Sequence, residues 1–308
     1  MRVNRRSPIA VFFTIALVTG SGAATAQPNA TAQPNGDESA AATATLARPA
    51  PADPCFLDEV TSNPTRPNWD TSATTTQCGV VEIDAGWLDQ PMGGGVHQTL
   101  LLTSMRYGLT PKLDLRWGLT NHMVQSGGGT EPLEGSGDQW LMARYRFLDQ
   151  GSRSPALAFL YGIKIATANP DKGFGSGFVD HQFTFIASRD LGKNHFDFNA
   201  VGVVVGEPGG HDGAVQCGLA LTRTVSRKIS WMLESYGGPQ PGTPDRFGAG
   251  FTGASFTVRP TLVLDAAYAR TFTAGAPRGQ IMFGFTYAMR SVFPPPSKDS
   301  ALARLLGR

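Results

Sequence analysis

The chain has few charged residues, few cysteines and no long apolar run after its first 26 residues. Charged side chains make up 16% of the 308 residues, against about 25% in ordinary soluble domains. No segment after residue 26 reaches the roughly 20 consecutive apolar residues that a membrane-spanning helix needs. The net charge is +2, and no basic patch with interleaved aromatic residues is present, so the sequence gives no indication of nucleic-acid binding.

The sequence also lacks the motifs of common metal sites and hydrolases. Its three cysteines and five histidines form no Cys-x-x-Cys and no His-x-x-x-His pair, so neither a metal nor a cofactor is expected. No serine stands in a Gly-x-Ser-x-Gly turn, and none is evidently placed beside a histidine on neighbouring strands. The sequence therefore does not predict an enzyme.

The N-terminus has the three parts of a bacterial secretory signal. Arg2, Arg5 and Arg6 supply basic charge, residues 9–18 form an apolar run, and Ala24-Thr25-Ala26 fits a small-residue cleavage site. The apolar run is too short for a spanning helix, which argues against a membrane anchor. We expect residues 1–26 to be a signal peptide and the remainder to be exported.

Two segments of different composition follow the signal. Residues 27–53 are mostly Ala, Thr, Pro, Gln and Asn, a composition that buries too little apolar surface to fold, so a disordered periplasmic leader is expected. Residues 54–78 are mixed and contain Cys55 and Cys78. In an oxidising compartment these cysteines can pair and stabilise the segment by about 3 kcal/mol, and two free thiols are the alternative. Cys217 is left over at a position predicted to face lipid.

Residues 79–290 consist of short stretches in which apolar and polar residues alternate, a pattern that predicts twelve strands. An even number returns both termini to the periplasm, as in single-chain bacterial outer-membrane barrels. The predicted fold is therefore all-β, a transmembrane antiparallel up-and-down β-barrel of about twelve strands, followed by a tail over residues 291–308. The strands are expected near 80–88, 96–108, 112–124, 139–148, 156–167, 178–190, 195–206, 213–225, 228–237, 246–258, 261–272 and 279–290.

The predicted connections alternate between short and long along the chain. Short ones include Thr110-Pro111 and Ser226-Arg227, whereas residues 127–137, 168–177 and 238–245 form longer connections rich in Gly, Pro and acidic residues. This alternation matches the periplasmic turns and extracellular loops of a barrel. A soluble β-sandwich, which would bury the same apolar faces as its core, gives no reason for such sorting.

The two faces of the predicted strands differ in polarity. Leu113, Leu115 and Trp117 alternate with Asp114 and Arg116, for example, and in a barrel the apolar face would meet lipid while the charged face would line the lumen. On a β-sandwich the charged face would be solvated surface instead. The lumen-lining candidates are Arg106, Asp114, Arg116, Arg144, Arg146, Lys164, Asp180, Asp197, Glu234, Arg246, Asp265 and Arg270.

Aromatic residues near the predicted strand ends match the girdles that barrels place at the two membrane interfaces. These residues are Tyr107, Tyr145, Phe147, Trp231, Tyr268 and Tyr287.

Three stretches of the chain resemble an outer-membrane barrel family labelled as components of a MetA pathway of phenol degradation. They are Asn63-Pro64-Thr65-Arg66-Pro67, Cys78-Gly79-Val80-Val81-Glu82-Ile83-Asp84-Ala85-Gly86-Trp87 and Arg106-Tyr107-Gly108-Leu109-Thr110-Pro111-Lys112-Leu113-Asp114-Leu115-Arg116. The resemblance extends from about Pro64 to Tyr287. It implies an outer-membrane location and passage of small compounds, aromatic ones among them, and it supplies no catalytic or ligand residue. Barrels of this kind commonly end on an aromatic residue, whereas here Phe293 is followed by three prolines and a basic tail.

The sequence leaves two functional classes open and a third less supported. The first is a passive transporter or channel for small compounds, aromatic or hydrophobic ones included, in the bacterial outer membrane. The second is a closed structural or surface-interaction barrel without transport, and the third is an outer-membrane lipid hydrolase. Expected partners are outer-membrane lipid and lipopolysaccharide, the barrel-assembly machinery and small-molecule solutes. Twelve strands predict a lumen narrower than the open channel of porins with 16 to 18 strands.

Overall fold

The computed structural model describes residue 55 and residues 59–273 and 277–291. The expected signal peptide, the leader and nearly all of the C-terminal tail lie outside these residues. The described chain is dominated by β-strands and includes one short 3₁₀ helix, η1 (Pro170–Lys172). None of its helices is long and apolar enough to cross a membrane.

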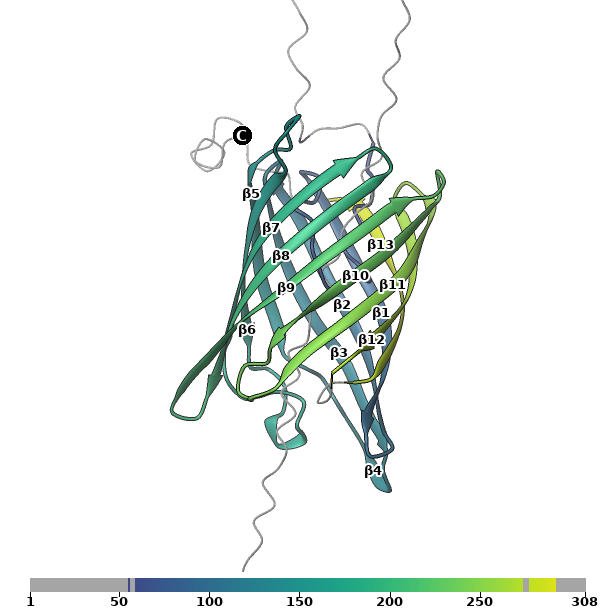
Figure 1. The fold of residues 1–308 in the computed structure, drawn as a ribbon. Helices are drawn as coiled ribbons and strands as arrows, with labels where there is room; N and C mark the ends of the chain where they lie inside the picture. The colour runs from purple at the N-terminus through teal and green to yellow at the C-terminus, as the bar shows by residue number, and fades with distance from the viewer. Residues whose placement is uncertain (1–54, 56–58, 274–276, 292–308) are drawn as a thin grey trace, which may run out of the picture.

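Twelve antiparallel strands close into a barrel (Figure 1). Each strand pairs with the next along the chain, except that β4 pairs only with β3 and the wall continues from β3 to β5. Strands β1 and β13 close the ring, with residue pairs that run from Val80 with Arg290 to Asp89 with Ile281. The predicted all-β barrel fold is confirmed. The strands are β1 (Val80–Gly93), β2 (Val96–Thr110), β3 (Leu113–Gly127), β4 (Thr130–Gly135), β5 (Gln139–Leu148), β6 (Ala156–Ile165), β7 (Asp180–Leu191), β8 (Asn194–Glu207), β9 (Gly210–Thr224), β10 (Ile229–Pro239), β11 (Arg246–Arg259), β12 (Leu262–Thr271) and β13 (Gly279–Arg290).

The connection expected over residues 127–137 is not an irregular loop. Strand β3 continues to Gly127 and returns as β4, which pairs only with β3 and extends beyond the barrel at its long-loop end (Figure 1). Gly127, Gly128 and Gly129 all have positive φ angles, which glycine adopts without steric cost in a tight turn. Strand β1 likewise runs past the expected Leu88, because the backbone groups of an extended hairpin satisfy each other.

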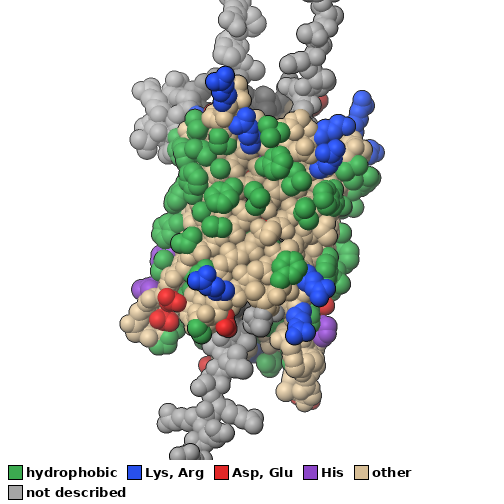
Figure 2. All heavy atoms as spheres, viewed as in Figure 1, with side chains coloured by type: hydrophobic (Ala, Val, Ile, Leu, Met, Phe, Trp, Pro, Cys, Tyr) green, Lys and Arg blue, Asp and Glu red, His purple; other side chains and the backbone are tan. Residues whose placement is uncertain are grey.

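Side chains alternate across the wall as the polarity pattern predicts. On β3, Leu115 and Trp117 are exposed on the outer surface whereas Asp114 and Arg116 are buried on the inner one. Apolar side chains therefore spread over the outer surface, and Lys and Arg side chains gather near its two ends (Figure 2). The expected girdle residues Tyr145, Phe147, Trp231 and Tyr268 are exposed there, and Tyr107 and Tyr287 are partly exposed.

The inward assignment of Arg246 and Arg270 is wrong. Arg270 pairs with Gly250 one position after Ala269, whose side chain is buried on the inner face. Alternation therefore turns Arg270 outward, and Arg246 is exposed at the first residue of β11. Both lie at the long-loop ends of their strands, where an arginine can reach water or headgroups.

We predict that a charge in the middle of the outer surface destabilises the barrel more than a charge at its edge. Phe185 is 41% exposed at the centre of β7, beside Phe159 and Ala200. Phe185→Arg is expected to lower the free energy of unfolding by about 2–4 kcal/mol. Val225→Arg, in the turn after β9, is the control and should cost about 0–1 kcal/mol. Reversible urea unfolding in vesicles measures both, and equal costs would contradict the membrane orientation.

Candidate functional site in the barrel lumen

Residues 59–78 fold into the barrel and fill part of its lumen, a placement that sequence analysis did not foresee. We call this segment the plug. From residue 64 to residue 73 every residue is buried except Trp69. The segment has no strand or helix of its own, so its backbone groups must find partners on the barrel wall.

One half of the plug binds the wall formed by β1, β12 and β13. The Asn63 amide donates to Glu82 Oε1 over 2.6 Å, and the Thr65 hydroxyl donates to Asp84 Oδ2 over 3.0 Å. Arg66 donates from Nη2 to the carbonyl oxygen of Phe283 over 3.2 Å, and its Nε lies 3.7 Å from Asp265 Oδ1. This half therefore combines backbone bonds to wall carboxylates with a buried ion pair.

The middle of the plug binds β10 and β8. The carboxylate of Glu234 accepts two successive plug amides, from Trp69 over 2.9 Å and from Asp70. Thr71 exchanges two hydrogen bonds with the side chain of Asn199, its amide donating over 3.1 Å and its carbonyl accepting over 2.8 Å. Polar wall side chains thus replace the neighbouring strand that the plug lacks.

The end of the plug is held by β3, β5 and β7. The Ala73 amide donates to Ser188 Oγ over 2.7 Å, and the Thr76 amide donates to Asp114 Oδ2 over 2.8 Å. Arg144 donates from Nη1 to the carbonyl oxygen of Ser72 over 2.6 Å. The plug is therefore bonded to strands all around the barrel.

Glycines on the wall make room for the plug. Gly86 and Gly284 pair across β1 and β13, and a Cβ on Gly86 would lie 1.9 Å from Arg66 Nη2. A Cβ on Gly218 of β9 would lie 2.1 Å from Asp70 Oδ1. Any side chain at these positions would overlap the seated plug, because Cβ atoms essentially never approach within 3.0 Å.

The structure places the remaining lumen-lining candidates on the inner face, mostly as fixed ion pairs. Arg106 binds Glu82 over 2.7 Å and Asp84 over 3.0 Å. Asp114 binds Arg116 over 3.1 Å and also binds Arg144. Glu82 and Asp84 were missed as candidates, although they alternate with apolar residues on the first predicted strand.

Two further candidates lie away from the plug layer. Lys164 binds Asp180 over 2.5 Å and Asp138 over 3.3 Å. Arg146 is half-buried at the short-turn mouth, where its Nε lies 2.8 Å from Asp149. Most charges of the inner wall are thus paired with one another. The inward arginines of β2, β3 and β5 are held in ion pairs with acidic residues of the barrel.

An apolar cluster lies on the long-loop side of the plug. On β1 the inward position after Gly86 is Leu88, and on β13 the inward position before Gly284 is Met282. Phe174, from the long connection between β6 and β7, is buried in the same cluster. The buried members are Leu88, Leu100, Met123, Ala168, Phe174, Met232, Phe251, Ala269 and Met282, with Leu102, Tyr236 and Ala267 packed against them. This cluster forms an apolar layer beside the charged one, and a second buried apolar cluster, formed by Trp140, Met142, Ala158, Leu160 and Ile186, packs around Ala73 of the plug.

Trp69 joins the plug to the apolar layer. Its ring stacks on Tyr236 of β10 with centroids 5.0 Å apart and planes at 3°. Phe247 packs edge-on against Tyr236, with ring centroids 6.2 Å apart. Trp69 also packs against Val201, Val203 and Val205 of β8.

The plug also brings a serine to a histidine, which sequence analysis did not expect. Ser72 Oγ lies 3.2 Å from His195 Nε2, and His195 Nδ1 lies 2.6 Å from Asp190 Oδ1. However, His195 Nε2 also lies 3.0 Å from Asp197 Oδ1. Carboxylates only accept hydrogen bonds, so both ring nitrogens donate and neither keeps a lone pair to remove the Ser72 proton. This arrangement is a buried polar contact, and within the described residues no group of three His, Cys, Asp or Glu side chains is arranged to hold a metal ion.

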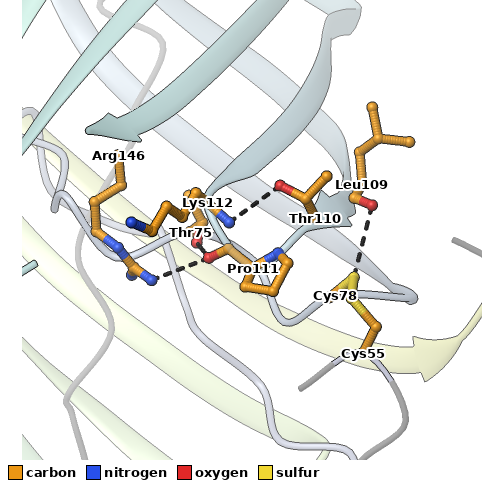
Figure 3. The surroundings of a disulfide bond; sticks show 8 residues. All are labelled: Cys55, Thr75, Cys78, Leu109, Thr110, Pro111, Lys112 and Arg146. Carbon is orange, nitrogen blue, oxygen red and sulfur yellow. Dashed lines mark hydrogen bonds between the residues drawn. A yellow bond between two sulfur atoms is a disulfide. The ribbon is translucent and has the colours of Figure 1, made fainter. Parts of the chain in front are cut away.

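A disulfide joins Cys78, the last residue of the plug, to Cys55, which precedes the plug in the sequence (Figure 3). The bridge lies beside the short turn between β2 and β3, where Thr75 Oγ1 donates to the Pro111 carbonyl over 2.7 Å. The plug therefore lies within a covalently closed loop, and it is bonded to short turns near both of its ends, at Pro260 and at Pro111. Cys217 is a free thiol exposed on the outer surface.

Comparison with known proteins supports the fold. No family model matches the chain, and no curated protein sequence does. The COG4313 outer membrane channel from Pseudomonas putida F1 matches with a TM-score of 0.55 at 15% identity, over 70% of this chain and 98% of that chain. The KdgM porin, also solved in complex with disordered oligogalacturonate, matches with a TM-score of 0.45 at 10% identity, over 67% of this chain and 98% of that chain. The chain thus has the fold of outer-membrane β-barrels.

We predict that filling a wall glycine unseats the plug. The added methyl group of Gly218→Ala overlaps the Asp70 carboxylate. Such overpacking costs about 1–3 kcal/mol. It should therefore lower the ratio of seated to unseated plug by about 5- to 150-fold. Ion conductance in planar bilayers should rise accordingly. Gly213→Ala on the same strand is the control, because its Cβ would make only an ordinary 3.5 Å contact with the Val203 carbonyl. Equal conductance of the two variants would contradict the seating.

We also predict that reduction of the disulfide loosens the plug. The bridge joins two cysteines that are 23 positions apart in the sequence. A disulfide that closes a loop of this size stabilises it by about 3 kcal/mol. The Cys55→Ser, Cys78→Ser double variant should therefore lower the ratio of seated to unseated plug by about 100-fold. Conductance with and without reductant measures this change, and Cys217→Ser is the control. Insensitivity of the parent protein to reductant would refute the prediction.

Proposed function

We propose that the protein is a channel or passive transporter of the bacterial outer membrane for small hydrophobic and aromatic compounds, closed at rest by its plug. The observation that carries this proposal is the division of the lumen into a charged layer and an apolar layer. The barrel and its alternating short turns and long loops support the location. Lipid, lipopolysaccharide and the barrel-assembly machinery are then its natural partners.

The apolar layer favours hydrophobic solutes over polar ones. A solute that comes from the long-loop end would pass the hydrogen-bonded side chains of Gln90, Gln98 and Gln280. It would then meet the cluster around Leu88, Met232 and Met282 before it reaches the plug. Burial of apolar surface there is favourable by about 25 cal/mol per Å², whereas a polar group without a hydrogen-bond partner costs about 1–3 kcal/mol. A porin for sugars or ions needs the opposite lining.

The plug itself favours the second candidate, a closed structural barrel. Its bonds to strands all around the wall and its disulfide would suit a permanent seal. A permanent seal, however, has no need for aromatic surface that stays accessible inside the wall, as Trp69 and Tyr236 provide. This feature is the reason for preferring transport.

The test is binding and uptake of 2-naphthol, a small apolar aromatic compound. Met232→Gln places a polar amide in the apolar cluster and should weaken binding by about 5- to 150-fold, the equivalent of 1–3 kcal/mol. Met232→Leu conserves volume and polarity and is the control, with a change below about tenfold. Calorimetry of the purified protein measures binding.

Uptake is measured in cells that express the protein in an intact outer membrane. Faster naphthol uptake with the parent protein than with Met232→Gln supports transport. A folded protein that neither binds naphthol nor speeds its uptake would favour the structural barrel.

A further inference from the structure

We propose that a neutral planar aromatic ligand releases the plug by taking the place of Trp69 on the ring of Tyr236. This inference rests on the proposed function and adds to it the ligand class and the way in which the ligand opens the barrel. Its basis is one aromatic stack between the plug, which must move for the lumen to open, and the barrel wall, which stays in place.

The stack is formed by one ring from the plug and one from the wall. Trp69 and Tyr236 lie 5.0 Å apart with planes at 3°, and among the described residues it is the one ring contact between plug and wall. Stacking depends on the π face rather than on specific bonds, so a ligand ring of similar size can replace the indole without further rearrangement of Tyr236. Tyr236 is held in place from the side by Phe247.

The stack is also the accessible part of the otherwise buried middle of the plug, residues 64–73. Trp69 is the one residue between 64 and 73 that is not buried, and Tyr236 is likewise partly exposed. Tyr236 points into the lumen, because Met232 and Glu234 at alternate positions of β10 are buried on the inner face. Tyr236 also packs against the apolar cluster, so the stack lies beside apolar side chains that favour an aromatic ligand.

The stack lies next to a polar anchor of the plug. Trp69 and Asp70 both donate their amides to the buried carboxylate of Glu234, two residues before Tyr236. A ligand ring on Tyr236 fills the space that the Trp69 indole occupies in the seated plug. The ligand and the seated position of Trp69 therefore exclude each other, so ligand binding and plug release favour each other.

The apolar surroundings of Tyr236 define the charge of the ligand. An aromatic anion at Tyr236 would have to leave water for the apolar cluster around Met232, where burial of an unpaired charge is strongly unfavourable. A saturated ring of the same size would fill space but could not stack. The geometry therefore favours neutral planar rings such as phenols and naphthols over aromatic carboxylates and alicyclic alcohols.

The test is single-channel conductance of the refolded protein with three related probes. We expect 2-naphthol to raise the open fraction by about 2- to 13-fold, the range of aromatic stacking free energies. We expect 2-naphthoate and decahydro-2-naphthol to leave the open fraction unchanged. A response to decahydro-2-naphthol equal to that for 2-naphthol would overturn the inference.

Variants of the two rings separate stacking from general packing. Tyr236→Leu should abolish the response to naphthol and Tyr236→Phe should restore it, because phenylalanine keeps the ring. Trp231→Leu, on the outer face of the same strand, is the matched control and should respond like the parent. An unchanged response in Tyr236→Leu would refute the inference.

Two further outcomes distinguish this inference from the proposed function. If naphthol binds and is taken up while the open fraction stays constant, transport stands and release through Trp69 is refuted. If naphthol neither binds nor is taken up, both fail. If Tyr236→Leu does not fold, it loses the heat-dependent shift in gel mobility that a folded barrel shows. Trp69→Leu is then the deciding variant. It should raise the open fraction without ligand, and an unchanged open fraction would overturn the inference.

Discussion

The antiparallel ladder between β1 and β13 is the constraint on which the rest of the structure depends. By closing the sheet it satisfies the backbone hydrogen bonds of both edge strands, which lipid could not do. Closure also creates an interior whose inward side chains have no other sheet to pack against. Twelve strands enclose more space than an eight-stranded barrel, whose side chains fill the interior alone. The chain fills the difference with its own residues 59–78.

Filling a lumen with an irregular segment requires polar partners for its backbone. The wall supplies them as carboxylates, an asparagine and a serine, and glycines provide the space for two charged plug side chains. Glu234, which accepts two successive amides, acts as the anchor of the middle of the plug. Because buried charges are stable only when paired, the arginines of β2, β3 and β5 are engaged by Glu82, Asp84 and Asp114 rather than aimed at a solute.

This arrangement reconciles a closed lumen with transport. Charged contacts hold the plug where water and ions would otherwise pass, and the apolar cluster receives solutes on the other side. Trp69 belongs to both layers, because its backbone binds Glu234 and its ring lies among apolar side chains. A single residue can therefore link the arrival of a solute to the stability of the seal.

The sequence by itself determined the wall of this protein. Alternation such as Leu113, Asp114, Leu115, Arg116 is a local property with a period of two, so it predicts strands, their count and the face of most side chains. It failed for Arg246 and Arg270, at strand ends where polarity no longer reports the direction of a side chain. The place of residues 59–78 was decided only by the tertiary structure. Their bonds join residues far apart in the chain, such as Asp70 with Glu234 and Thr71 with Asn199, and no local pattern records a contact that exists only after the barrel has closed.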